Sequence, residues 1–123
     1  LSTAADRQLA NAIRDYVAQC NDNDVNKKIS AYADAAVPVI IWGAGSHTQR
    51  LLGSTDLPRC NTVAIVDNDS NKHGLLMAGV RVAAPESVRD IPGTILVAAA
   101  LHADAIRAEI RSMQLPHSVD VLG

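Results

Sequence analysis

The chain has 123 residues, of which 48% are hydrophobic and 20% are charged, and its formal net charge is −2. This is the composition of one ordinary globular domain, and it excludes wholesale disorder. Without a basic excess, without phenylalanine and without an apolar run of bilayer length, we expect neither a nucleic acid nor a membrane as a partner.

Residues 1–36 have a helical pattern. A first helix is indicated by an apolar stripe at helical spacing, made of Leu9, Ile13, Tyr16, Val17 and Cys20. Asp24 is placed to cap a second helix, on which Val25, Ile29 and Tyr32 share one face. We expect residues 1–36 to form a helical extension or linker that carries no chemistry of its own.

From residue 37 to residue 123, apolar strands alternate with helical segments. Residues 37–42 form a short continuous apolar run ending at Gly43, which is typical of a strand buried on both faces of a parallel sheet. Further strands are expected at 62–66, 80–83, 94–99 and 119–122, and helical segments at 46–52, 85–89 and 101–113. This order predicts an α/β fold: a small Rossmann-like parallel sheet flanked by helices on both faces, in which 80–83 can also be a hairpin partner.

A strand-to-helix turn of the dinucleotide-binding type follows the first strand and reads Gly43-Ala44-Gly45-Ser46. Gly43 permits the tight turn, and Gly45 lets the backbone approach a phosphate closely. The helix that begins there offers free amides and a positive dipole end to an anion, and Ser46 can add its hydroxyl. The third fingerprint position holds Thr48 instead of a small residue, which predicts a looser contact between helix and strand.

An acidic residue, Asp67, follows the second strand, where dinucleotide-binding folds place an acid that accepts hydrogen bonds from ribose hydroxyls. Lys72 and His73, in the polar loop that follows, can close over the ligand. His47, just past the glycine turn, either touches the ligand or faces solvent. In the alternative interpretation the glycines serve only the turn, and Asp67 only caps the loop that begins at Asn68.

Catalytic and metal-binding sets are not evident. The histidines have no common metal-ligand spacing, so we expect no metal site. No complete acid–base or nucleophile set is present, so we expect no catalytic residue in this chain. Cys20 and Cys60 are expected to be free thiols, and no secretory signal is visible, which favours a cytoplasmic location.

Taken together, the residues from 37 onward resemble a known module. The shared pattern is IIWGAGSHTQRLL, then VAIVDNDSNKHGLLMAGVRVAAPESV, then TILVAA and a helix. It resembles the C-terminal Rossmann-like domain of S-adenosylmethionine-dependent sugar C-methyltransferases and related polysaccharide-biosynthesis proteins. The motif positions in this sequence are Gly43-Ala44, Asp67, Lys72-His73-Gly74 and Gly79.

The resemblance implies a nucleotide- or nucleotide-sugar-binding accessory domain, joined to an upstream catalytic domain of the same protein that would bind the methyl donor. The glycine turn would hold phosphate and Asp67 the ribose. A nucleotide sugar, S-adenosylmethionine and NAD all stay open as ligands, and a homo-oligomer stays open as well. The helices before the first strand favour a C-terminal module.

Two alternatives belong to other classes. The first is the NAD-binding half of a nucleotide-sugar oxidoreductase or epimerase, which predicts NAD binding by this chain and a Tyr-x-x-x-Lys pair in the remainder of the protein. Neither Tyr16 nor Tyr32 has lysine four residues on. The second is a structural interaction module that binds no ligand. Its support comes from Thr48 and from the two acids Asp67 and Asp69, because added negative charge opposes phosphate.

Overall fold

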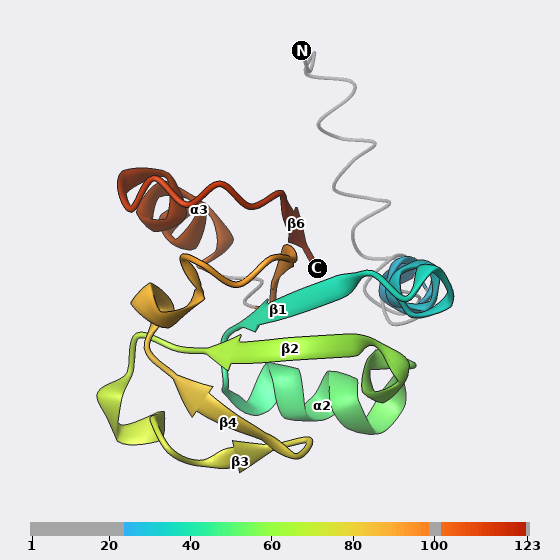
Figure 1. Cartoon of the computed structure of the whole chain (residues 1–123). Coiled ribbons are helices and arrows are strands. Elements are labelled where there is room, and N and C mark those ends of the chain that lie inside the picture. The colour runs from blue at the N-terminus through green and yellow to red at the C-terminus, as the bar shows by residue number, and fades with distance from the viewer. Residues whose placement is uncertain (1–23, 99–101, 123) are drawn as a thin grey trace, which may run out of the picture.

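A computed structural model describes residues 24–98 and 102–122, which form an α/β fold with a central six-stranded sheet (Figure 1). The strands are β1 (Pro38–Trp42), β2 (Asn61–Val66), β3 (Leu76–Met77), β4 (Val80–Ala83), β5 (Thr94–Val97) and β6 (Val119–Val121). The helices are one over residues 24–35, α2 (Ser46–Ser54) and α3 (Ala103–Ser112), with the 3₁₀ turns η1 (Leu57–Arg59), η2 (Ser70–Lys72) and η3 (Pro85–Val88).

The strand order β3-β4-β2-β1-β5-β6 is that of a Rossmann-like sheet. Strands β4, β2, β1, β5 and β6 run parallel, and only the short edge strand β3 runs antiparallel, against β4. The chain builds outward from β1 to β4, then crosses back to place β5 on the other side of β1. This reversal puts a topological switch point at the carboxyl end of β1, and the predicted α/β Rossmann-like fold is confirmed.

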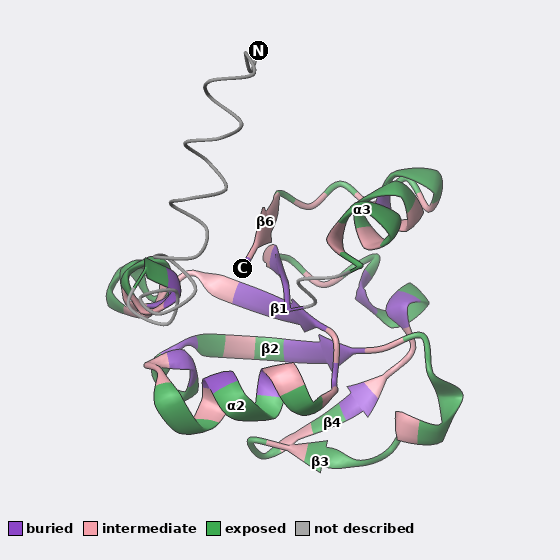
Figure 2. Ribbon diagram, turned by 180° about the vertical axis from the view of Figure 1, so that it is seen from behind, coloured by how far each residue is buried: buried purple, intermediate pink, exposed green. Residues whose placement is uncertain are grey.

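The central strand β1 is buried on both of its faces, as its unbroken apolar run predicts (Figure 2). Val39 and Ile41 belong to the core cluster that also holds residues of α2 and of the helix over 24–35. Ile40 and Trp42 belong to a second cluster on the opposite face, together with residues of η3 and α3. The alternation of side chains along one strand therefore joins helices on both faces into one domain.

The helix over residues 24–35 packs directly on the sheet. Val25 and Ile29 are buried and Tyr32 is partly buried against the same cluster, so the predicted shared face is confirmed. The Tyr32 hydroxyl donates a 2.8 Å hydrogen bond to Oδ2 of Asp120, and Nζ of Lys28 lies 3.2 Å from Oδ1 of the same carboxylate. These contacts fix the helix to the edge strand β6.

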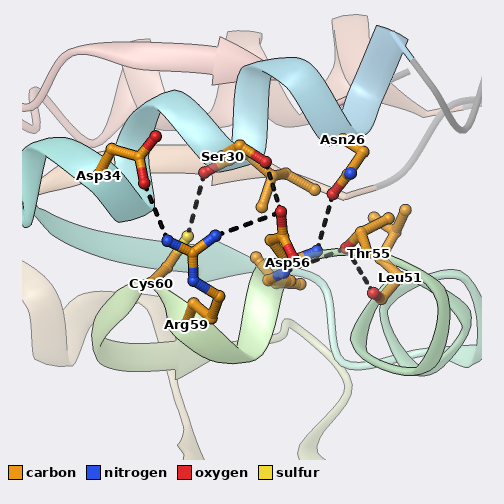
Figure 3. A network of polar contacts seen from close by, with 10 residues as sticks. Asn26, Ser30, Asp34, Leu51, Thr55, Asp56, Arg59 and Cys60 are labelled. Atoms are coloured by element: carbon orange, nitrogen blue, oxygen red, sulfur yellow. Dashed lines mark hydrogen bonds and ion pairs between the residues drawn. The ribbon is translucent and has the colours of Figure 1, made fainter.

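A second polar network holds the same helix to the segment after α2 (Figure 3). Asn26 accepts a 2.8 Å hydrogen bond from the amide of Asp56, and the Ser30 hydroxyl donates to the Asp56 carboxylate at 2.6 Å. Arg59 pairs with Asp34 at 2.9 Å. The two contacts of Asp56 are partly buried and the ion pair of Arg59 is exposed, and together they orient the helix against this segment.

Two expectations about the first 36 residues have separate outcomes. Asp24 is the first described residue of the helix, so its expected role as the cap stays a prediction. The apolar stripe from Leu9 to Cys20 lies outside the described residues, and a domain boundary at residue 36 stays a prediction. None of the helices in the described part of the chain is long and apolar enough to cross a membrane.

The sequence did not indicate strand β3. It forms a hairpin with β4 around Ala78 and Gly79, which have φ angles of +52° and +78°. Two consecutive residues with positive φ are the requirement of the two-residue turn that fits twisted strands. The prediction that residues 80–83 have a hairpin partner is confirmed, and these residues also pair in parallel with β2.

Candidate functional site

The turn after β1 depends on Gly43. Its φ is +118°, and its amide donates a 2.8 Å hydrogen bond to the carbonyl of Val66 in the neighbouring strand. A Cβ added at this position would lie 3.1 Å from the carbonyl oxygen of Ala98, which follows β5. Both the backbone angle and the close approach therefore require glycine, and the turn lies between the carboxyl ends of β2 and β5.

Thr48 closes the same turn from the helix. Its side chain is fully buried, and its hydroxyl donates a 2.6 Å hydrogen bond to the carbonyl of Gly43. The expected loosening at this position is therefore not observed. The hydroxyl gives the carbonyl of Gly43 a hydrogen-bond partner. Thr48 thereby joins α2 to β1 at the position where dinucleotide-binding folds have a small residue.

The carboxylate of Asp67 joins the glycine turn to the loop after β2. Its Oδ2 accepts a 2.8 Å hydrogen bond from the amide of Ala44, and its Oδ1 accepts one of the same length from the amide of Asp69. The ammonium of Lys72 lies 3.7 Å from Oδ2. Asp67 thus caps its own loop, as one interpretation expected, and it also holds the glycine turn. Its contact with a ribose stays a prediction.

These contacts determine the charge of Asp67. Burial alone would raise the pKa of the carboxyl group, but the amides of Ala44 and Asp69 and the charge of Lys72 lower the pKa below its usual value. The side chain is only 17% exposed, so little solvent screens these contacts. Asp67 is therefore a fixed anion at neutral pH, and it is balanced by the adjacent lysine.

Ala44 has a structural place in the turn. It is 6% exposed, it packs in the core, and its amide is committed to Asp67. It is also absent from the lining of the cavity described below. The expectation that Ala44 would face a phosphate is corrected on these grounds: its N–H group is already hydrogen-bonded, and its side chain points into the core.

The first amides of α2 remain open. The helix has no side-chain cap, and no acidic residue lies in its first turn. The first intrahelical hydrogen bond runs from the amide of Gln49 to the carbonyl of Gly45. The amides of Gly45, Ser46 and His47 therefore have no acceptor among the described residues. They lie at the N-terminus of α2, which is the positive end of the helix dipole.

A cavity of about 510 Å³ lies at this point of the sheet. It opens at the carboxyl ends of β1 and β5, the switch point at which open α/β sheets bind ligands. Its lining consists of Trp42, Gly43, Gly45, Ser46, His47, Asp67, Asn68, Lys72, Ala98, His102 and Ile106. The lining includes six of the residues expected from the sequence, namely Gly43, Gly45, Ser46, His47, Asp67 and Lys72, and it lacks Ala44 and His73.

Lys72 and His47 line the cavity, whereas His73, which was also expected near the ligand, does not. Lys72 lines the cavity and His47 contributes its ring, whose Nε2 is buried without a partner among the described residues. Nδ1 of His47 lies 3.4 Å from the guanidinium of Arg50. His73 instead turns back, with its Nε2 2.6 Å from the carbonyl of Asp67, and it is not in the lining. Lys72 alone closes over the turn from this loop.

The sequence did not single out the far wall of the cavity. His102 and Ile106 come from the start of α3, and Asn68 donates a 2.5 Å hydrogen bond to Glu109 of that helix. Residues that follow different strands meet here because the carboxyl ends of parallel strands share one edge of the sheet. Their common position after a predicted strand was the available signal.

The chemistry of the cavity suits the binding of an anion. It presents open helix amides, the ammonium of Lys72 and an imidazole nitrogen of His47. The thiol of Cys60 lies elsewhere in the core, where burial raises its pKa. Within residues 24–98 and 102–122, no group of three or more metal-ligating side chains is assembled.

Comparison with known proteins gives three findings. No curated protein matches the chain. Among solved structures, the chain is similar to UDP-D-quinovosamine 4-dehydrogenase from Vibrio fischeri, with 21% identity over 69% of this chain and 76% of that chain and a TM-score of 0.49. The model of the family described as C2185-like, N-terminal, matches residues 35–118, which include the whole glycine turn and the cavity lining. The chain therefore belongs to the C2185-like N-terminal family.

Proposed function

We propose that this domain binds a phosphate-bearing nucleotide, with a nucleotide sugar as the preferred class, in the cavity at the switch point. The phosphates lie on the open amides of Gly45, Ser46 and His47. The ammonium of Lys72, which lies beside Gly45, neutralises their charge. The described residues of the cavity include no complete catalytic set, and we propose that the domain holds a ligand for chemistry performed elsewhere.

The observation that carries this proposal is the empty space over Gly45. Unlike Gly43, Gly45 has a φ of −101°, which any residue adopts. A Cβ placed there would meet, within 4 Å, only the Nζ atom of Lys72 at 3.5 Å, an ordinary contact with a flexible side chain. Folding therefore does not require a glycine at this position. A ligand that approaches the backbone does require one.

The electrostatics of the site support a phosphate. Helix N-terminal amides bind anions by hydrogen bonds and by the dipole of the helix. Lys72 lies against both Gly45 and Asp67, so its charge sits beside the open amides. Asp67 opposes an anion, but its own charge is balanced by two amides and by Lys72.

The size and the walls of the cavity suit the rest of a nucleotide. Its volume of about 510 Å³ falls within the range of small-molecule sites. Ala98 and Ile106 give it an apolar side, against which a base or a sugar ring can pack. The lining therefore offers both polar groups for the phosphates and apolar side chains for a ring of the ligand.

The biological context is a further part of the proposal. We place the domain, over residues 37–123, in a methyltransferase-like protein of sugar or polysaccharide biosynthesis, with residues 1–36 as a helical extension toward a catalytic domain. What supports this is the motif of Gly43-Ala44, Asp67, Lys72-His73-Gly74 and Gly79. S-adenosylmethionine and NAD are the competing ligands that the experiment below includes.

One observation favours a second candidate, a structural interaction module. The carboxylate of Asp67 already occupies the amide of Ala44, so one donor of the glycine turn is used within the fold. If the remaining amides served only to end the strand, the cavity would stay without a ligand. The two candidates differ in whether any nucleotide stabilises the domain.

A proline substitution tests directly whether the amides at the start of α2 bind phosphate. Ser46 is the first residue of α2, where proline fits a helix, and the extended conformation of Gly45 is compatible with a following proline. Ser46→Pro removes one amide donor together with the hydroxyl, whereas Ser46→Ala removes the hydroxyl alone. Both variants are titrated calorimetrically with UDP-glucose, NAD and S-adenosylmethionine, beside the unchanged protein.

The proposal predicts that UDP-glucose binds, that Ser46→Ala binds it within about threefold of the unchanged protein, and that Ser46→Pro loses about tenfold, the value of one charge-assisted hydrogen bond. Circular dichroism checks that both variants fold. Absence of heat with all three ligands would favour the structural module, and equal binding by both variants would place the phosphates elsewhere.

A further inference from the structure

We propose that Asp67 is a positioning residue of the glycine turn, and that the site recognises the phosphates of its nucleotide and not the ribose hydroxyls. This inference rests on the proposed function and deepens it. It assigns to Asp67 a task different from the ribose contact that its place after β2 suggests.

The carboxylate is committed on both of its oxygens. Oδ2 holds the amide of Ala44 and Oδ1 holds the amide of Asp69, each at 2.8 Å. A ribose diol that took over these oxygens would leave two backbone amides without their acceptor, and Ala44 is buried. Leaving a buried amide unsatisfied is costly, and this cost would offset what the hydroxyl pair contributes to binding.

Lys72 makes the approach to this carboxylate unfavourable for a ribose. Its ammonium lies 3.7 Å from Oδ2 and beside Gly45, and it offers donors only. A phosphate oxygen is an anionic acceptor and gains more from this ammonium than a neutral ribose hydroxyl does. The ion pair therefore holds the ammonium of Lys72 beside the turn, where it suits a phosphate. The carboxylate of Asp67 stays bound to the backbone of the fold.

The place of Asp67 beneath the turn also sets the geometry of the open amides. Ala44 directly precedes Gly45, so the hydrogen bond to Asp67 fixes the peptide plane from which the phosphate-binding backbone continues. We therefore expect Asp67 to act on every phosphate-bearing ligand alike, whatever sugar it carries.

The test is a cycle of ligand and protein changes. The affinities of UDP, 2′-deoxy-UDP and inorganic pyrophosphate are measured by calorimetry on the unchanged protein and on Asp67→Asn, with ADP and 2′-deoxy-ADP as a second pair. Asp90→Asn, an exposed acid beyond the cavity lining, is the matched control. The inference predicts that removing the 2′-hydroxyl changes the affinity by less than about threefold, and that Asp67→Asn changes all affinities by one common factor.

A second readout does not depend on a folded variant. Amide hydrogen exchange of Ala44 in the unchanged protein reports the hydrogen bond to Asp67. The inference predicts that Ala44 stays protected when UDP binds, because Asp67 remains in the turn. If Asp67 moved to the ribose, exchange at Ala44 would accelerate on binding.

The outcomes separate this inference from the proposed function. A loss of tenfold or more for the 2′-deoxy ligands, abolished by Asp67→Asn, would overturn the inference and leave nucleotide binding intact. Accelerated exchange at Ala44 on binding would do the same. If neither the nucleotides nor pyrophosphate bind, the proposed function and the inference both fail.

Discussion

The amide of Ala44 donates a 2.8 Å hydrogen bond to Oδ2 of Asp67, and this contact joins the carboxyl ends of the two neighbouring central strands β1 and β2. It fixes the turn from which α2 begins, and it draws Lys72 over the same turn through the ion pair at 3.7 Å. One acidic side chain thereby organises both the backbone donors and the cation of the candidate site.

The stability of the fold should depend on pH through this carboxylate. Because the pKa of Asp67 is lowered in the folded state, its contribution to stability is present above the ordinary pKa of 3.8 and is lost as pH falls through the folded pKa. Asp67→Asn should lower the free energy of unfolding by about 1–3 kcal/mol at neutral pH. Urea unfolding, followed by the fluorescence of Trp42, measures the difference.

The same difference should shrink from neutral to acid pH, as the pH falls through the lowered pKa of Asp67 and the carboxyl group of the unchanged protein is also protonated. Asp90→Asn, at an exposed position, should leave stability within about 0.5 kcal/mol at both pH values. A difference for Asp67→Asn that stays constant from neutral to acid pH would show that the charge of Asp67 is not what stabilises the turn.

Three glycine-to-alanine substitutions should separate folding from binding. Gly43→Ala should cost about 2–3 kcal/mol, because φ is +118° and the Cβ would press on a carbonyl at 3.1 Å. Gly53→Ala, inside α2 with no atom near its Cβ position, should stabilise the fold by about 0.5–1 kcal/mol. Gly45→Ala should cost less than about 1 kcal/mol.

Gly45→Ala is the informative member of this series, because it should fold and yet bind UDP-glucose at least tenfold more weakly. Thermal unfolding gives the stabilities, and calorimetric titration gives the affinities. If Gly45→Ala bound as tightly as the unchanged protein, the phosphates would not approach this backbone.

Much of the central architecture could be predicted from local pattern. The unbroken apolar run of β1 indicated a doubly covered strand, and the Gly43-Ala44-Gly45 turn followed by Asp67 indicated a strand-to-helix turn of the dinucleotide-binding type. These features depend on neighbours in sequence, on the period of the strand and on the backbone freedom of glycine, so the sequence carries them directly.

The remaining features depend on contacts between distant residues. Lys28 and Tyr32 meet Asp120 across the sheet, and no local pattern encodes that register. Lys72 reaches the space over Gly45 only because the loop after β2 folds back through η2. Sequence reasoning placed Lys72 near the ligand, but it could not foresee that Asp67 would hold both the turn and the lysine.

The docking of the helix over residues 24–35 predicts an unusual tyrosine titration. Burial, and then the hydrogen bond and the charge of Asp120, raise the pKa of Tyr32 to about 12. Its contribution to stability is therefore present below the ordinary pKa of 10.0 and is lost as pH rises through about 12. Tyrosinate absorbance of the unchanged protein minus that of Tyr32→Phe isolates this titration.

Asp120→Asn should return the pKa of Tyr32 toward 10.0, because it removes the nearby charge. Tyr32→Phe should cost about 1 kcal/mol through the lost hydrogen bond. An ordinary tyrosine titration in the unchanged protein would mean that this helix does not pack on β6 in solution.

The hairpin between β3 and β4 contains a strained position that can be relieved. Ala78 has a φ of +52°, where a side chain costs about 1 kcal/mol. Ala78→Gly should therefore raise the free energy of unfolding by about 0.5–1 kcal/mol. Ala84→Gly, at an ordinary φ of −72°, should lower it by a similar amount. Equal destabilisation by both variants would contradict the assigned turn.

The most direct test of the whole account is a fluorescence titration of Trp42, the one tryptophan of the chain, which lines the cavity. UDP-glucose should produce a saturable change in its emission. Lys72→Met should weaken binding by about tenfold, and Lys27→Met, the same charge change on an exposed residue outside the cavity lining, should not. An emission that does not respond to UDP-glucose, or equal affinity in the two lysine variants, would contradict phosphate binding at this turn.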